Sequence, residues 1–196
     1  AEVLSHLGAV YIDLGRLEEA GRFLSRAETI LARQPTPPVA DLARTLNLLG
    51  ALAYKQGDLK AAEARYSRSL ELLRGEAQPP PREVALALNN LAILAWRRAD
   101  FTTAEARYRE ALVVNEELLG ANHPHLAAQL NNMGILARDL GNFAESERLH
   151  RRALAIAEKA LGPAHPDVAA ILSSLARLYG RQGRVEEGIA LLERAL

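Results

Sequence analysis

The sequence predicts an all-α protein, a solenoid of five antiparallel helix pairs. First, a local pattern recurs every 42 residues and is marked by Gly15, Gly57, Gly141 and Gly183, with Ala99 in the one slot that lacks glycine. Second, apolar residues recur at helical spacing on both sides of each marker. Third, proline-containing segments separate the copies. A fixed period with two amphipathic helices per unit is typical of a stacked array, in which no unit buries its apolar face alone.

The first helix of each unit carries an apolar face. We give each residue a column number, which is its position in the 42-residue period counted from Ala1. Columns four, seven and ten are apolar in every unit: Leu4, Leu46, Leu88, Leu130, Leu172; Leu7, Leu49, Leu91, Met133, Leu175; and Val10, Leu52, Leu94, Leu136, Leu178. Residues three apart lie on one face of a helix, so this face is the predicted core.

The second helix of each unit begins with an apolar or aromatic residue and has a small residue three positions later. The small residues are Ala20, Ala62, Ala104, Ser146 and Gly188, and they would let the paired helices approach closely. The predicted helices span 1–14, 17–33, 38–56, 59–75, 82–98, 101–119, 124–140, 143–161, 166–182 and 185–196. We expect a single array, 1–196, with units of about 1–36, 37–80, 81–122, 123–164 and 165–196.

The turns inside the units predict a left-handed backbone. Glycine is favoured just after a helix because it adopts positive φ without a steric penalty. Ala99 should therefore strain its turn, at a cost of up to ~1–2 kcal/mol if the left-handed geometry is kept. Asp100 is placed to cap the next helix. Between units, PTPP, QPPP, GANHP and GPAHP supply prolines that suit a first helical turn.

Composition limits the function classes. With 24 basic and 24 acidic residues the chain has no formal net charge, so general attraction to nucleic acid or anionic lipid is not expected. It has no cysteine, which excludes disulfides and thiolate metal sites. No apolar stretch of about 18 residues predicts a membrane span, and no secretory h-region is visible, so we expect a cytoplasmic protein.

No catalytic or cofactor motif is found, and we predict that the chain is not an enzyme. Phosphate-loop and dinucleotide motifs are absent, and serines such as Ser173 lie in predicted helices rather than on a strained turn. His123 and His125 form a lone His-x-His without further ligands, so no metal site is predicted. Glutamates such as Glu18 and Glu19 begin second helices, where they favour the helix dipole.

These residues resemble the tetratricopeptide repeat, in the 42-residue form of kinesin light chains. Leu7, Gly8, Tyr11, Gly15, Ala20 and Ala27 match the short consensus, and Asn131, Asn132, Gly141, Ala153 and Leu154 match the longer form. The resemblance covers the whole chain and implies a right-handed superhelix of five units that binds proteins. His-Pro junctions occur only at His123-Pro124 and His165-Pro166, so we expect the two earlier junctions to differ in conformation.

In such stacks the first helices line a concave groove, and we expect columns two, five, nine, twelve and thirteen to face solvent there. Asparagines recur in column five and in the adjacent column six, and an amide can both donate to and accept from a peptide backbone. The resemblance implies this role for Asn47, Asn89 and Asn131. The predicted peptide-binding residues are Arg44, Asn47, Tyr54, Lys55, Asn89, Asn90, Trp96, Arg97, Asn131, Asn132, Arg138 and Arg177.

The basic and aromatic residues among these favour an extended peptide with acidic residues around an aromatic or apolar anchor. Two simpler interpretations stay open: the asparagines are inherited by repeat copying, and Trp96 packs between helices beside solvated arginines. A different class of function is a structural, self-associating or regulatory module of a larger protein with no groove ligand. We expect the chain to be a fragment of such a protein, or else to pair end to end through its apolar C-terminal helix. Nucleic acid is a weaker candidate partner, because acidic residues interleave the arginines.

Overall fold

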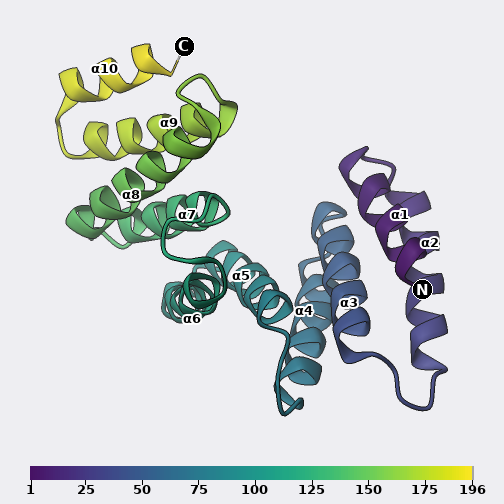
Figure 1. Ribbon diagram of the computed structural model, residues 1–196. Helices are drawn as coiled ribbons and strands as arrows, with labels where there is room; N and C mark the ends of the chain where they lie inside the picture. Colours follow the sequence, from purple (N-terminus) through teal and green to yellow (C-terminus); the bar gives the residue numbers. More distant parts are fainter. Residues whose placement is uncertain (196) are drawn as a thin grey trace. The chain divides into compact units, whose positions relative to one another are not determined.

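The structure, a computed structural model, describes residues 1–195. It divides into two compact units, which are larger than the 42-residue repeats: unit 1 is Ala1–Arg98 and unit 2 is Ala99–Leu196. Unit 1 contains α1 (Glu2–Asp13), α2 (Leu17–Ala32), α3 (Val39–Lys55), α4 (Leu59–Arg74) and α5 (Pro81–Arg97). Unit 2 contains α6 (Phe101–Leu119), α7 (Leu126–Asp139), α8 (Phe143–Leu161), α9 (Pro166–Arg181) and α10 (Val185–Arg194). All ten predicted helices form, with bounds that differ from the prediction by one or two residues at most ends (Figure 1).

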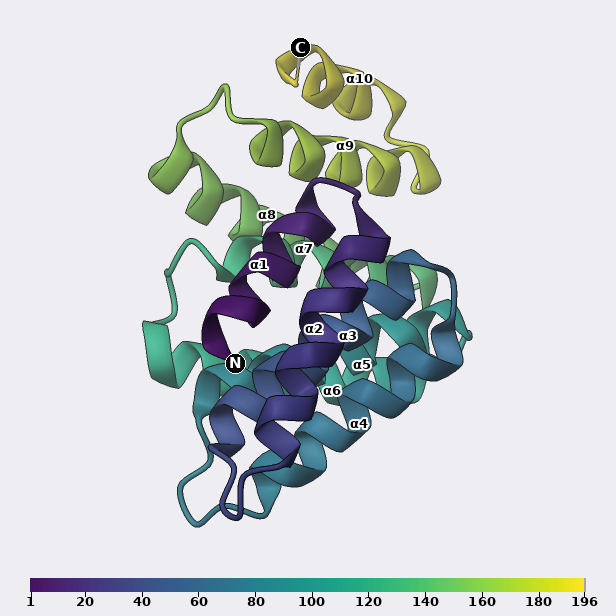
Figure 2. The same cartoon turned by 90° about the vertical axis from the view of Figure 1, so that its right-hand side faces the viewer.

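Helices pair in antiparallel fashion within each unit, as α1 with α2 and α9 with α10 (Figure 2). Glycine sets how closely α3 approaches α4 and α7 approaches α8. A Cβ added at Gly50 of α3 would lie 2.5 Å from the Tyr66 ring of α4, and one added at Gly134 of α7 would lie 2.7 Å from the His150 ring of α8. At these two positions of column eight, a ring from the second helix fills the space that a side chain of the first helix would occupy. Column eight was not recognised from the sequence as the contact point.

The predicted leucine face forms the core of both units except in α1, where Leu7 and Val10 of columns seven and ten are exposed. Leu46, Leu88, Leu130 and Leu172 in column four are at most 3% exposed. Each second helix packs on the first helix of the next pair, as α2 does on α3, α4 on α5 and α8 on α9. In unit 1, α1 also packs on α3 and α3 on α5, while no comparable contact joins α2 to α4 in the residues described. The first helices therefore approach one another more closely than the second helices do, and they form the inner layer of that unit.

The turns inside the pairs confirm the predicted left-handed backbone. Gly57 and Gly141 have φ of 83° and 78°, and Ala99 adopts the same region at φ 60°. Ala99 is the only non-glycine residue with positive φ among residues 1–195, so it carries the expected strain. Asp100 caps the following helix, as predicted, because its carboxylate accepts a hydrogen bond from the Thr103 amide at 3.2 Å.

The junctions between pairs differ in the two units, as expected. Val39 of α3 follows an extended Pro38, and α5 begins at Pro81 after an extended Pro80. In unit 2, the imidazole Nδ1 of His123 accepts from the His125 amide at 3.3 Å, and that of His165 accepts from the Asp167 amide at 3.1 Å. His165 is thus the N-cap of α9, whereas α7 begins at Leu126, two residues later than predicted, after an N-cap His125 whose side chain makes no cap hydrogen bond.

Candidate functional site

The expectation that column five faces solvent is wrong for the first two pairs. Asn47 is only 2% exposed, and among residues 1–195 neither its amide nitrogen nor its amide oxygen has a hydrogen-bond partner. Ser5, in the same column of α1, is buried and bonded to Thr45 of α3 at 2.9 Å. Column five points between helices because the first helices pack on one another. Asn89 in α5 is half-buried, with its amide oxygen buried and unpaired.

Asn131 in unit 2 is half-buried and already has a partner within its own pair. Its amide oxygen accepts from Nδ1 of His150 at 3.0 Å. His150 is fully buried, and Nε2 has no hydrogen-bond partner. Burial first, and then the charges of Arg138 and Arg177, lower the pKa of His150 to about 4. His150 is therefore neutral at pH 7. His150 occupies the same column as the buried Tyr66, and this correspondence in the sequence could have predicted its burial.

Arg44 was predicted to face the groove, but in the structure it forms an ion pair. Its guanidinium lies 3.0 Å from the carboxylate of Glu83 on α5 and 3.7 Å from that of Asp41 on its own helix. Glu83 is 8% exposed, so Arg44 compensates a buried carboxylate between α3 and α5. This contact stabilises the inner layer of unit 1 and leaves Arg44 less available to a ligand than Arg97.

The structure brings Tyr54 and Arg97 together on the inner layer of unit 1. The Arg97 guanidinium donates to the Tyr54 hydroxyl at 3.0 Å and lies 5.4 Å from the ring centroid. Arg97 is exposed, and no carboxylate pairs with it in the described part of the chain. Lys55, next to Tyr54, is also exposed, whereas Trp96 and Asn90 are half-buried. A cation held against an aromatic ring without a counterion can bind a carboxylate.

In unit 2 the predicted residues are more dispersed. Arg138 pairs with the adjacent Asp139 at 2.8 Å and is half-buried. Arg177 is exposed and donates only to the Ser173 carbonyl, at 3.4 Å. Asn132 is half-buried. Of the two predicted cations in this unit, Arg177 is the one to which the described residues, up to 195, offer no carboxylate partner.

Among residues 1–195, no group of three or more histidine, aspartate or glutamate side chains is placed to hold a metal ion. None of the helices described is long and apolar enough to span a membrane.

Comparison with known proteins agrees with this architecture. The chain matches the tetratricopeptide repeat family model over residues 1–75, 83–142 and 126–196. It is similar to BtubC (BKLC) from P. vanneervenii, with TM-score 0.86 and 25% identity, over 98% of this chain and 76% of that one. No curated protein matches the chain.

Two further solved structures share the fold at lower identity. A putative kinesin light chain from Podosopora anserina, with nearly identical TPR-like repeats, aligns with TM-score 0.79 and 19% identity over 98% of this chain and 91% of that one. The Rap conjugation gene regulator of plasmid pLS20, solved in complex with the Phr* peptide, aligns with TM-score 0.74 and 15% identity over 96% and 50%. With family matches along nearly its whole length and three helix pairs that close on a glycine, the chain belongs to the tetratricopeptide repeat family.

Proposed function

We propose that the inner layer of unit 1 binds an extended peptide segment that carries acidic residues around an aromatic or apolar anchor. The observation that carries the proposal is the Tyr54–Arg97 pair, in which an exposed guanidinium is held against an aromatic ring with no carboxylate partner. Lys55 adds a second exposed cation beside it. A peptide carboxylate would replace solvent at Arg97, and an aromatic side chain would pack beside Tyr54.

The proposed site uses seven predicted residues in unit 1, which are Arg44, Tyr54, Lys55, Asn89, Asn90, Trp96 and Arg97. Asn47 is left out because it is buried. Arg97 and Lys55 supply charge, Tyr54 and Trp96 supply apolar area, and the half-buried Asn89 and Asn90 supply amides. In unit 2, Asn131, Asn132, Arg138 and Arg177 are proposed as contacts of a second, separate site. Support for peptide binding on this fold comes from the Rap regulator, which was solved with a bound peptide.

Binding by this surface needs no chemistry on the ligand, and we propose a protein-interaction scaffold rather than an enzyme. The alternative, a self-associating module, has support in α10, whose Val185, Ile189 and Leu192 are 51%, 50% and 47% exposed. That alternative stays a prediction.

The test uses a set of fluorescein-labelled 12-residue peptides in which acidic residues flank one phenylalanine, with lysine-for-acid versions as controls. We expect the acidic peptides to bind and Arg97→Glu to weaken binding roughly tenfold or more, because a charge-assisted hydrogen bond becomes a repulsion. Arg26→Glu on the exposed face of α2 is the matched control and should have no effect. Binding should also change the emission of Trp96, the sole tryptophan. Unchanged affinity of Arg97→Glu for the acidic peptides would contradict the proposal.

A further inference from the structure

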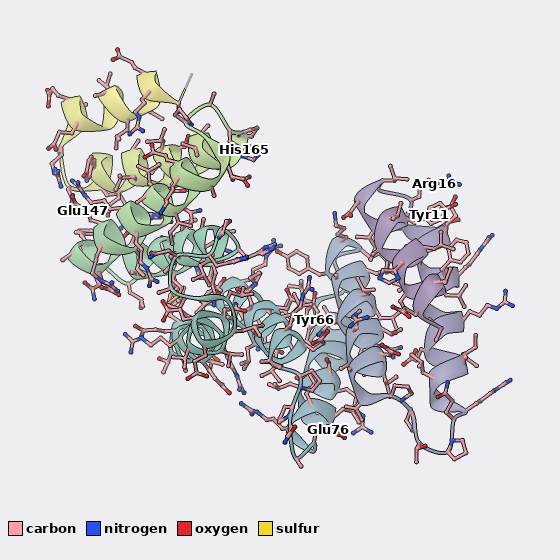
Figure 3. The ribbon with its side chains drawn as sticks, viewed as in Figure 1. Tyr11, Arg16, Tyr66, Glu76, Glu147 and His165 are labelled. Carbon is pink, nitrogen blue, oxygen red and sulfur yellow. The ribbon has the colours of Figure 1, made fainter. Side chains whose placement is uncertain are left out.

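Three helix pairs close on a glycine in column eight, and each presents a different side chain to it from column 24 of the second helix. The facing residues are Leu24 on Gly8, Tyr66 on Gly50 and His150 on Gly134. Tyr66 is labelled in Figure 3. A Cβ added at any of these glycines would lie 2.5 to 2.7 Å from the facing side chain. The same backbone contact therefore accepts an aliphatic, a phenolic or an imidazole side chain.

Of these three side chains, the imidazole is the one that bonds to column five of the paired helix. Nδ1 of His150 lies 3.0 Å from the amide oxygen of Asn131. In the pair α3–α4, where the facing ring is that of Tyr66, the Asn47 amide has no hydrogen-bond partner among residues 1–195. His150 is thus distinguished by its chemistry rather than by the shape of its contact.

This bond determines which nitrogen of His150 carries the proton. An amide oxygen accepts and cannot donate, so the neutral ring is protonated on Nδ1. Nε2 is then a bare nitrogen, and it is buried without a partner among the described residues. If the amide of Asn131 were turned so that its nitrogen donated to Nδ1, Nε2 would carry a buried proton with no acceptor. Orphaned buried N–H groups are rarer in proteins than orphaned acceptors, which favours the first arrangement.

The hydrogen bond from His150 also fixes how Asn131 meets a ligand. The Asn131 side chain is half-buried, and its amide nitrogen, unlike that of Asn47, is not a buried unpaired atom. An amide that is free to turn can offer either its oxygen or its nitrogen to a ligand. Because His150 occupies the oxygen, Asn131 offers the nitrogen, which is a donor.

Two arginines lie near this amide. Arg177 belongs to α9, which packs beside α7, and it is exposed without a carboxylate partner among residues 1–195. Arg138 pairs with Asp139. Burial first, and then the charges of Arg138 and Arg177, lower the pKa of His150, so both guanidinium groups lie near its ring. A carboxylate that is attracted by Arg177 would therefore come close to the Asn131 donor.

We propose that His150 is a positioning residue of the second peptide site, the one in unit 2, and that it makes Asn131 a dedicated donor to a ligand carboxylate bound at Arg177. This inference rests on the proposed function of unit 2 and adds a buried residue that determines which ligand atom Asn131 contacts. A ligand group that can only donate, such as an ammonium, meets no acceptor at Asn131 and is repelled by Arg177.

The test uses the full chain with Arg97→Glu, which weakens binding at unit 1, and the fluorescein-labelled acidic peptides as the probe. His150→Leu removes the donor and copies the contact that Leu24 makes with Gly8. His150→Asn keeps an N–H donor near the position of Nδ1 but fills less space. Fluorescence polarisation should show binding weakened roughly fivefold or more by His150→Leu, the loss of about one hydrogen bond, and largely restored in His150→Asn.

A purely structural role of His150 predicts the opposite order, because leucine fills the contact and asparagine leaves a void. Equal affinities of the two variants, or tighter binding by His150→Leu, would overturn the proposal. Circular dichroism checks that both variants are folded. Nitrogen-15 NMR of the histidine ring in the ligand-free chain gives an independent readout, and we expect the proton on Nδ1 at pH 7. A proton on Nε2 would also overturn the proposal.

Arg177→Glu and Asn131→Ala separate this inference from the proposed function. If both weaken binding and His150→Leu does not, unit 2 binds the peptide and His150 does not position Asn131. If neither changes the affinity, or if the chain with Arg97→Glu does not bind the probe, the second peptide site is absent and the inference fails with it.

Discussion

The pairs α3–α4 and α7–α8 share one backbone design and differ in the chemistry at their contact. Each closes on a column-eight glycine, Gly50 or Gly134, that faces a ring from the second helix. In α3–α4 the ring is Tyr66, and the neighbouring column-five Asn47 is buried with both amide atoms unpaired. In α7–α8 the ring is that of His150, and the asparagine of the same column bonds to it.

The same column of the repeat sets the shape of the helix contact in both pairs. The residue that faces this column differs, and the chemistry of the contact differs with it. The glycine fixes how closely the helices approach in both pairs, because any side chain there would occupy the space of the ring. The identity of the ring then decides whether the asparagine has a partner. It also decides whether the pair responds to pH. Burial raises the pKa of Tyr66, so its hydroxyl stays neutral, whereas His150 can be protonated under mild acid.

The largest expected effect is from filling the glycine contact. Gly50→Ala and Gly134→Ala should each destabilise the chain by about 1–3 kcal/mol, because a Cβ would have to displace a buried ring. Urea unfolding followed by circular dichroism measures the change. Gly180→Ala is the matched control, since it lies in a helix with nothing within 4 Å of the added Cβ. Its helix propensity should give about 0.5–1 kcal/mol of stabilisation. Equal effects at all three glycines would refute the close-contact explanation.

The second test distinguishes the Tyr66 contact from the His150 contact by the pH dependence of the free energy of unfolding. The pKa of His150 is lowered from 6.5 to about 4 in the folded chain, so between these values the unfolded state binds more protons than the folded state. Stability should therefore fall as pH is lowered from 7 to 5, by about 2 kcal/mol from this residue. Unfolding at both pH values measures it.

His150→Tyr gives α8 the tyrosine that α4 has in the same column. This variant should lack the part of the pH dependence that comes from His150. The other four histidines are unchanged in this variant, so the difference between the two proteins isolates His150. The same slope in both proteins would show that His150 does not contribute.

Asparagine substitutions should have opposite signs in the two pairs. Asn47→Leu removes a buried amide with no hydrogen bonds and should stabilise the chain by about 1 kcal/mol. Asn131→Leu leaves Nδ1 of His150 without its acceptor and should cost about 1–2 kcal/mol. Thermal unfolding of both variants at pH 7 compares them. A loss of stability in Asn47→Leu would mean that its amide has a partner in solution.

The smallest effect concerns the turn, where both compared pairs have glycine and the third repeat has Ala99. Ala99→Gly should stabilise the chain by roughly 0.5–1 kcal/mol, because relief of left-handed strain exceeds the entropic cost of glycine. The reciprocal change Gly57→Ala should destabilise by a similar amount, since Gly57 has φ 83°. Unfolding midpoints of the two variants should move in opposite directions, and movement in the same direction would contradict the assignment of strain to φ.

Much of the fold follows from the sequence because the period repeats local signals. Helix bounds, the turn at Ala99 and the cap by Asp100 all depend on residues near in the chain, and all were predicted. The candidate site was predicted less well. Column five was expected to face solvent, but Asn47 is buried, since contact between successive first helices covers that column. Arg44 was expected in the groove, yet it compensates Glu83 from the next pair.

By itself the sequence determined ten helices, the pairing of α1 with α2, α3 with α4, α7 with α8 and α9 with α10, the column-four leucine core and the strained turn, because propensity, capping and apolar periodicity act within a few residues. Only the tertiary structure decided which polar residues of the inner layer are exposed, that His150 is buried against Gly134, and that Tyr54 holds Arg97. It also showed that Glu147 and Arg151 of α8 bond to the Tyr179 hydroxyl and that Glu147 pairs with Arg184. The physical reason is that burial and pairing depend on residues of other helices, 43 positions apart for Tyr54 and Arg97 and 19 for Asn131 and His150, and identical columns meet different neighbours.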